Sequence, residues 1–345
     1  MNAHFDPTYG SALRLPQPYL LFLADTVDAG FAKTAFGLRD WAGDKCVGEF
    51  AIGATVSTGL PVMTPAEARA AGARALVIGV ANSGGVIGDS WIASLVEALE
   101  AGLDIVSGMH ARLSEIPELV EAAARLGRRL IDVRVPPSGL RVGTGAKRSG
   151  KRLLTVGTDC ALGKKYTALA LANAFAARGV DVDFRATGQT GIMIAGGGMP
   201  MDAVVSDFEA GAAEMLSPDA DPGHWDVIEG QGSLFHPAYA AVSLGLLHGS
   251  QPDVIVVCHE PGRQVMLGTT FAAPSVEDTI ALNLELGRRT NPAIRCGGVA
   301  LNTSQLDADE AARVIAAESE RLGLHVADPI RGGAAFDALV EACLK

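Results

Sequence analysis

The segment from Gly157 to Thr167 constrains this chain more than any other, because it has the pattern of a loop that binds phosphate. An apolar, β-branched run at 152–156 precedes it, and the apolar positions of a helix follow Lys164. Between a strand and a helix, backbone N–H groups and the positive end of the helix dipole face an anion, and a lysine can reach between phosphate groups. The segment therefore predicts a phosphate-binding loop in an α/β domain.

The residue after the loop lysine departs from the common pattern. Nucleotide hydrolases have Ser or Thr there, and its hydroxyl binds the Mg²⁺ that bridges two phosphates. This chain has Lys165 instead. A second cation opposes a divalent metal, so we expect phosphate binding that requires no metal. Thr167, slightly further into the helix, is the alternative source of a hydroxyl.

Cys160 lies inside the loop, where a helix N-terminus can lower the pKa of a thiol. No histidine is close to it in sequence, so we interpret Cys160 as a loop residue rather than a nucleophile. The residues that the loop offers to a phosphate-bearing cofactor are Gly157, Thr158, Asp159, Cys160, Gly163, Lys164, Lys165, Tyr166 and Thr167.

Length and composition limit the class of protein. A chain of 345 residues, 48% of them hydrophobic, is long enough for two cores. A formal net charge of -11 argues against nucleic acid or an anionic membrane as a partner. The five cysteines form no Cys-x-x-Cys pair, and neither a leader nor a membrane-spanning run is evident, so we expect a cytoplasmic protein.

Domain boundaries follow from a change in composition. Strand and helix patterns alternate before residue 136, which predicts a parallel sheet covered on both faces. Residues 137–150 are rich in Pro, Gly and Ser and break this alternation. We therefore expect one α/β domain over 1–136, a linker over 137–150 and the phosphate-loop domain over 151–345.

Two later segments resemble those of dethiobiotin synthetase and its relatives, as does the Gly-Thr-Asp start of the loop. The run from Trp225 to Ser233 resembles their acidic strand end and glycine turn, and 298–302 resembles the strand whose terminal asparagine reads adenine. That resemblance implies a P-loop NTPase-like domain in which Asn302 contacts the adenine of a cofactor. An asparagine that caps a strand end is the alternative for Asn302.

The loop, the run 185–191 and the run 229–234 together resemble a family long known only as a domain of unknown function, whose characterised branch is the DgcN type. This resemblance covers essentially the whole chain. It implies an N-terminal Rossmann-like domain, a C-terminal P-loop domain and D-glutamate N-acetyltransferase activity. It also implies acetyl-CoA as co-substrate, an acidic D-amino acid as substrate and a homo-oligomer.

Acetyl transfer to an amine requires a base and donors that stabilise an oxyanion. Glu229, which follows a buried strand, is our first choice of base, with His236 and His259 as reserves. The rival role for Glu229 is the metal-associated acid of a nucleotide enzyme. Donors expected near the same sheet edge are Gln189, Thr190, Gln231 and Ser233. Arginines expected to bind substrate carboxylates are Arg185, Arg263 and Arg331.

Two other functions fit the same residues. One is an ATP-dependent ligase or kinase that resembles dethiobiotin synthetase, against which Lys165 argues. The other is a nucleotide-sensing protein without turnover, in which a ligand shifts the domains. Sequence alone fixes neither the acyl donor nor the stereochemistry of the amine.

Overall fold

A computed structural model describes residues 13–345 of the chain. These residues divide into two compact units, and the chain passes between the units more than once. The N-terminal unit consists of residues 13–136 and Gln189–Pro200, and the C-terminal unit consists of Pro137–Gly188 and Met201–Lys345. Both units are α/β and each contains a parallel sheet, which confirms the expected fold class.

The C-terminal unit is built on a six-stranded sheet in which every pair of neighbours is parallel. Its strands are β7 (Lys151–Gly157), β8 (Val182–Arg185), β10 (Trp225–Ile228), β11 (Val254–His259), β12 (Arg295–Leu301) and β13 (Val326–Ala327), in the order β13-β12-β11-β7-β10-β8. Strand β7 lies between β10 and β11 and is buried from its second residue onward, as its apolar, β-branched sequence predicts. The loops after these three strands therefore meet at one sheet edge.

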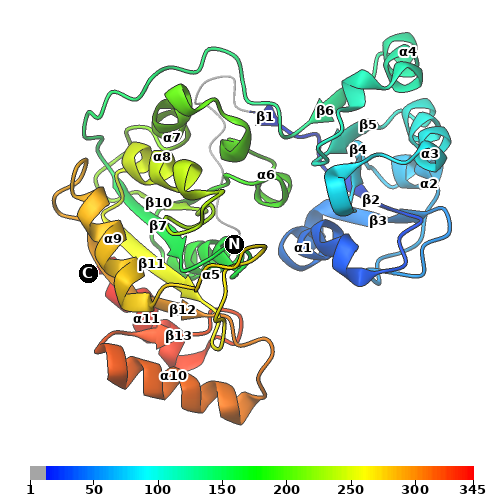
Figure 1. The fold of residues 1–345 in the computed structure, drawn as a ribbon. Coiled ribbons are helices and arrows are strands. Elements are labelled where there is room, and N and C mark those ends of the chain that lie inside the picture. The colour runs from blue at the N-terminus through cyan, green and yellow to red at the C-terminus, as the bar shows by residue number, and fades with distance from the viewer. Residues whose placement is uncertain (1–12) are drawn as a thin grey trace. The chain divides into compact units, whose positions relative to one another are not determined.

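Helices cover both faces of this sheet (Figure 1). They are α5 (Lys164–Ala177), α7 (Glu209–Leu216), α8 (Ala240–Ser250), α9 (Val276–Gly287), α10 (Ala308–Leu322) and α11 (Gly333–Leu344). Helix α5 packs beside α11, whereas α7, α8 and α9 pack together on the other face. Ser275 caps α9 by accepting a hydrogen bond from the N–H of Asp278, which fixes the helix start.

The N-terminal unit has a five-stranded parallel sheet in the order β3-β2-β4-β5-β6. Its strands are β2 (Tyr19–Ala24), β3 (Cys46–Ala51), β4 (Ala75–Ile78), β5 (Asp104–Ser107) and β6 (Leu130–Asp132), and its helices are α1 (Lys33–Ala42), α2 (Pro65–Ala70), α3 (Asp89–Glu100), α4 (Pro117–Leu126) and α6 (Gln189–Ala195). Strands β2 and β4 are wholly buried and supply the centre of its hydrophobic core. A separate two-stranded antiparallel pair joins β1 (Leu13–Arg14) to β9 (Gly197–Gly198).

Two segments, 137–150 and Gln189–Pro200, show where the chain crosses from one unit to the other. The chain leaves the C-terminal unit after Gly188, and α6 then packs in the N-terminal unit, where the Tyr19 hydroxyl donates to the carbonyl of Met193 at 3.0 Å. Residues 137–150 belong to the C-terminal unit, where backbone N–H groups of Thr144 and Ser149 donate to surface carboxylates. Among the described residues, no helix has both the length and the apolar character needed to cross a membrane.

Packing of α5 against the sheet predicts where the C-terminal unit is most sensitive to mutation. Phe175 is fully buried on α5, and its ring meets Trp225 of β10 edge to face at 5.4 Å between centroids. We expect Phe175→Ala to lower the free energy of unfolding by about 3–5 kcal/mol, because it removes apolar contacts and leaves a cavity. Guanidinium denaturation followed by circular dichroism measures this change. Phe271→Ala, at a ring that is 59% exposed, is the control; equal losses in both variants would contradict the assignment.

Candidate functional site

The phosphate loop connects β7 directly to α5 at the carboxyl edge of the sheet. Gly163 precedes the first helical residue with a φ of +98°, a backbone conformation that favours glycine. The Lys164 ammonium is buried under the loop and donates to the carbonyl of Asp159 at 2.6 Å. Burial lowers the pKa of Lys164, so an anion in the loop would stabilise its charged form.

The carboxylate of Asp159 ties the loop to a neighbouring segment. It accepts hydrogen bonds from the N–H of Cys160 at 2.6 Å, from Arg263 at 2.8 Å and from the N–H of Leu267 at 2.7 Å. Burial alone would raise the pKa of Asp159, but the Arg263 guanidinium and the two N–H groups outweigh it and lower that pKa. Arg263 also pairs with Glu260. Arg263 therefore positions the loop through Asp159, and its guanidinium is already bonded within the protein.

Glu229 follows β10 and is 5% exposed. Its Oε2 accepts hydrogen bonds from the N–H groups of Thr187 at 2.9 Å and Gly188 at 3.1 Å. Within residues 13–345, no hydrogen bond reaches its Oε1. Burial raises the pKa of Glu229, whereas the charge of Lys165 and the two N–H donors oppose that rise. The arrangement is that of an oriented carboxylate able to accept a proton.

A glycine allows the turn after Glu229 to pass close to β7. A Cβ on Gly230 would lie 1.6 Å from the carbonyl oxygen of Thr155, and the N–H of Gly230 donates to the Thr155 hydroxyl at 2.9 Å. The predicted donors Gln231 and Ser233 follow in this turn. The Gln231 amide donates to the Thr187 hydroxyl at 2.8 Å, and the Ser233 hydroxyl donates to the carbonyl of Thr158 at 3.2 Å.

The two candidate histidines differ in what they can do. Both ring nitrogens of His236 are engaged: Nε2 lies 2.9 Å from the carbonyl of Leu267, and Nδ1 accepts from the N–H of Ala238 at 3.2 Å. These bonds hold the imidazole ring in place, and the role of His236 as a reserve base stays a prediction. His259 makes one ring contact, from Nδ1 to the Thr158 hydroxyl at 3.0 Å, and burial lowers the pKa of His259, which favours the neutral imidazole.

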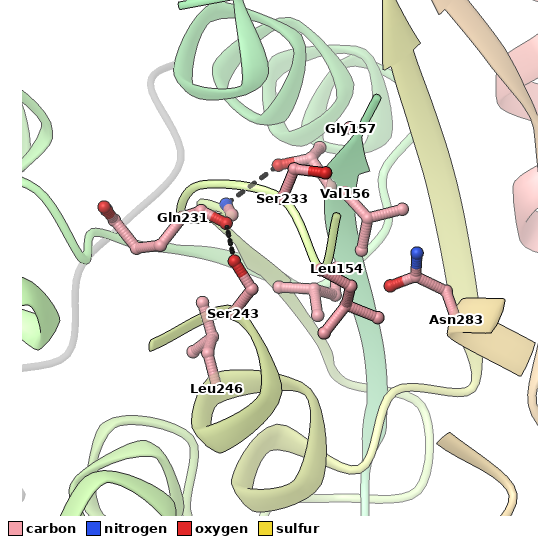
Figure 2. A pocket seen from close by; sticks show the side chains of 11 residues that line it. Leu154, Val156, Gly157, Gln231, Ser233, Ser243, Leu246 and Asn283 are labelled. Atoms are coloured by element: carbon pink, nitrogen blue, oxygen red, sulfur yellow. Dashed lines mark hydrogen bonds between the residues drawn. The ribbon is translucent and has the colours of Figure 1, made fainter. Parts of the chain in front are cut away.

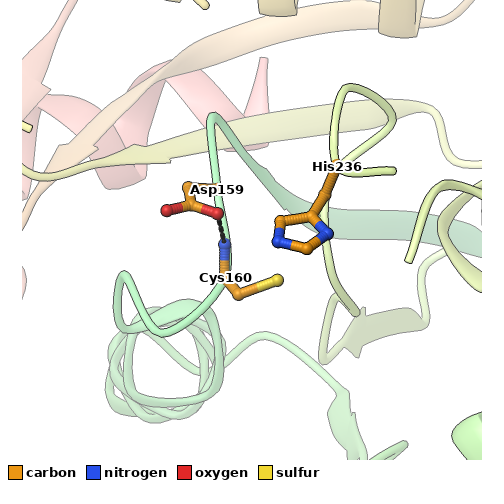
Figure 3. A group of neighbouring side chains, drawn as sticks. All are labelled: Asp159, Cys160 and His236. Carbon is orange, nitrogen blue, oxygen red and sulfur yellow. Dashed lines mark hydrogen bonds between the residues drawn. The ribbon is translucent and has the colours of Figure 1, made fainter. Parts of the chain in front are cut away.

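Asp159, Cys160 and His236 lie together, with one ligand-type atom from each within 4.8 Å of the others (Figure 3). Residue types alone make this group a candidate metal site. The Asp159 carboxylate and both His236 nitrogens are already bonded, however, and burial raises the pKa of the Cys160 thiol. The group therefore holds the loop in place, and it offers a metal no prepared set of ligands.

Arg185 is bonded within the protein, and its role as a substrate ligand stays a prediction. Its guanidinium pairs with Asp183 at 2.9 Å and Asp226 at 2.6 Å in a buried ion cluster. His224 joins this cluster, with Nδ1 at 2.9 Å from Asp181 and Nε2 at 3.2 Å from Asp226. A polar hollow of about 440 Å³ borders the cluster. The positive charges of Arg185 and protonated His224 compensate the negative charges of Asp183 and Asp226.

Asn302 and Arg331 lie at the end of β12 and in the loop before α11. Asn302 Oδ1 accepts from the N–H of Ser304 at 3.2 Å, which satisfies its acceptor and leaves the amide N–H₂ as the group that can read an adenine. Arg331 donates to the hydroxyl of Thr303 at 2.7 Å and to the carbonyl of Leu306 at 2.6 Å. These bonds fix the loop, and the role of Arg331 in binding a substrate carboxylate stays a prediction.

Gln189 and Thr190 begin α6 and belong to the N-terminal unit. The Thr190 hydroxyl lies 3.3 Å from that of Thr34. Tyr166 and Thr167 lie on α5: the ammonium of Lys165 is 4.4 Å from the centre of the Tyr166 ring, and the side chain of Thr167 is buried.

A water-sized cavity of about 10 Å³ lies behind the loop (Figure 2). Its lining includes Gly157, Ser233, Ser243 and Asn283, and the Ser243 hydroxyl donates to the carbonyl of Gln231 at 2.8 Å. A cavity of this size holds about one water molecule and no substrate.

Sequence reasoning missed two groups that build the site. The backbone N–H groups of Thr187 and Gly188 orient Glu229, and the glycine shortly after the end of β8 was the signal for them. The N–H of Leu267 binds Asp159 from far along the chain, and no residue pattern marks a backbone donor of this kind.

Comparisons with known proteins cover nearly the whole chain. Residues 141–340 match the family model described as "Domain of unknown function (DUF1611_C) P-loop domain", and residues 45–136 match "Domain of unknown function (DUF1611_N) Rossmann-like domain". A relative from Pseudoalteromonas sp is 48% identical over 93% of this chain and 97% of its own length, and is named D-glutamate N-acetyltransferase. One from Tritonibacter scottomollicae with the same name is 49% identical over 92% and 96%.

A solved structure is similar to this chain in fold. The crystal structure of a DUF1611 family protein from Anabaena variabilis has a TM-score of 0.81 and 34% sequence identity to this chain. The match covers 95% of this chain and 98% of that one.

The buried ion cluster predicts a pH dependence of stability. The hydrogen bond to Asp226 raises the pKa of His224 to about 9, against the opposing effect of burial and with help from Asp181. Because the folded protein binds this proton more tightly than the unfolded chain, the stabilisation is complete below about pH 6.5 and is lost as pH rises through about 9.

We therefore expect the free energy of unfolding to fall by up to about 3 kcal/mol between pH 7 and pH 10. His224→Gln, which cannot titrate, should lose most of that fall. Urea denaturation of both proteins across this range measures it, and parallel curves for the two would contradict the assignment.

Proposed function

Because the chain belongs to the DUF1611 family, we propose that it is a D-glutamate N-acetyltransferase, which moves an acetyl group from acetyl-CoA to the amine of D-glutamate. The observation that carries this proposal is the pair of relatives with that name, each at least 48% identical over more than nine-tenths of both chains. With such coverage, the loop and the carboxyl edge of the sheet lie within the matched region.

The phosphate loop fits the carrier half of acetyl-CoA. The carrier has a diphosphate and an adenine, and the site has adjacent cations at Lys164 and Lys165 with a donor amide at Asn302. Acetyl-CoA would supply the acetyl group as a thioester, from which the CoA thiolate leaves readily. The role of the loop in this proposal is to hold the carrier, since neither transfer nor release of the acetyl group consumes a phosphate bond.

Glu229 is the proposed base. The ammonium of an amino acid must lose a proton before its nitrogen can attack a thioester, and a carboxylate with a raised pKa accepts that proton better than an ordinary one. The N–H groups of Thr187 and Gly188 keep Glu229 oriented.

His259 is the reserve base, and the amides and hydroxyls of the turn after Glu229 are the proposed oxyanion donors. Gln231 carries a second amide hydrogen beyond the one given to Thr187, so it can donate to the developing oxyanion. Gln189 and Thr190 remain proposed substrate contacts.

We also propose a cytoplasmic location and a homo-oligomer. All five cysteines are free thiols, which agrees with a compartment that keeps thiols reduced. The oligomer rests on the family resemblance, and sedimentation of the purified protein tests it.

Thiol release tests the reaction directly. Purified protein with acetyl-CoA should release free CoA on addition of D-glutamate, with much less on addition of L-glutamate, and a chelator should leave the rate unchanged. Mass spectrometry of the product should show one added acetyl group. Release of ADP from ATP in a magnesium-dependent reaction, without thiol release on any amino acid, would instead support the ligase alternative.

Replacement of Glu229 tests its role. We expect Glu229→Gln to lower kcat by roughly 10²- to 10⁴-fold, because it removes the base but keeps the shape of the side chain. The affinity for CoA, measured by calorimetry, should change little. Glu285→Gln, at an exposed glutamate of α9, is the matched control. An unchanged kcat, or a loss confined to CoA affinity, would remove Glu229 from the chemistry.

A further inference from the structure

A P-loop domain ordinarily holds Mg²⁺ between two protein groups. These are the hydroxyl of the residue after the loop lysine and an acidic side chain at the end of a neighbouring strand. Magnesium demands near-ideal octahedral geometry and oxygen ligands. In this chain the two positions are occupied by Lys165 on α5 and Glu229 after β10.

Within residues 13–345, protein partners orient several of the hydroxyls near the loop. Four of these hydroxyls have a protein partner: Thr155 contacts the carbonyl of Lys164, Thr158 contacts His259, Thr187 donates to the carbonyl of Glu229, and Ser233 donates to the carbonyl of Thr158. Thr167, the alternative source suggested by the sequence, is buried on α5.

The acidic side chain at the end of the neighbouring strand, Glu229, is held by protein groups in place of a metal. Two backbone N–H groups occupy Oε2 of Glu229, and these donors orient the carboxylate without any cation. Within residues 13–345, Glu229 makes no direct ion pair with Lys165. The two charges nevertheless influence each other, since Glu229 opposes the effect of burial on the pKa of Lys165.

Lys165 is placed to bind an anion. Its side chain is largely enclosed, its ammonium lies 4.4 Å from the centre of the Tyr166 ring, and it makes no hydrogen bond within the described residues. An ammonium has three N–H donors. A ring face attracts the charge but accepts no conventional hydrogen bond, whereas a phosphate oxygen accepts one. The next residue along the chain, Lys164, is the lysine that phosphate loops use.

We propose that the ammonium of Lys165 replaces Mg²⁺ in this loop, so that Lys164 and Lys165 together bind a diphosphate without any divalent metal. A lysine one residue beyond the loop lysine thereby selects a ligand whose phosphate bonds stay intact. This inference deepens the proposed function by assigning the phosphate contacts of its carrier, but it depends only on diphosphate binding and not on acetyl transfer.

Calorimetric titration of the full chain with ADP and with CoA tests the inference. Both ligands should bind in the presence of a chelator, and excess Mg²⁺ should change neither dissociation constant by more than about twofold. ADP lacks the acyl-carrying arm, so its metal-free binding supports the inference even if no acetyl transfer is found. Binding of both ligands only when Mg²⁺ is present, or strengthened tenfold or more by it, would overturn the inference.

Substitution of the lysine provides the converse experiment. Lys165→Met should weaken the binding of both ADP and CoA roughly 10- to 100-fold, because it removes a charge-assisted hydrogen bond.

Lys165→Thr introduces the hydroxyl that nucleotide hydrolases have at this position. The affinity of this variant for ADP should be low with chelator and should rise with Mg²⁺. Lys33→Thr, at an exposed lysine of α1, is the matched control and should bind as the parent does. Thermal melting establishes that each variant is folded, and folded Lys165 variants that bind like the parent would contradict the proposal.

Discussion

The balance of charge at the carboxyl edge of the C-terminal sheet is the constraint on which the site depends. Lys164 and Lys165 bring two positive charges to the start of α5, where the helix dipole adds to them. Asp159 does not neutralise them, because it is committed to Arg263 and to two backbone N–H groups. Glu229 is a buried acid at the same edge, and it is oriented by Thr187 and Gly188. In the proposed function, the two lysines bind phosphate and this carboxylate accepts a proton.

Sheet topology brings these groups together. Strand β7 has β10 and β11 as neighbours, so Gly157, Glu229 and His259 reach the same edge from distant parts of the sequence. The close approach of Gly230 to Thr155 then fixes how near the Glu229 turn comes to the loop. A rigid sheet edge of this kind positions side chains better than mobile loops do.

Sequence reasoning succeeded where local pattern decides structure. The glycines and lysine of the loop, the buried strand before it and the acid after β10 all follow from residue types over short spans. It does not give the bonding partners of side chains whose partner is distant in sequence. Arg185 bonds Asp226, Arg331 bonds Thr303, and His236 contacts Leu267, and none of these pairings is visible in the sequence. The place of α6 in the N-terminal unit is non-local for the same reason.

Diffraction from crystals soaked with CoA and Mn²⁺ gives the most direct test of metal-free diphosphate binding, because Mn²⁺ scatters anomalously and substitutes for Mg²⁺. The account predicts that Lys165 Nζ lies within hydrogen-bond distance of a diphosphate oxygen and that no anomalous peak lies beside it. A manganese peak that bridges the diphosphate and Glu229, with Lys165 turned away, would contradict it.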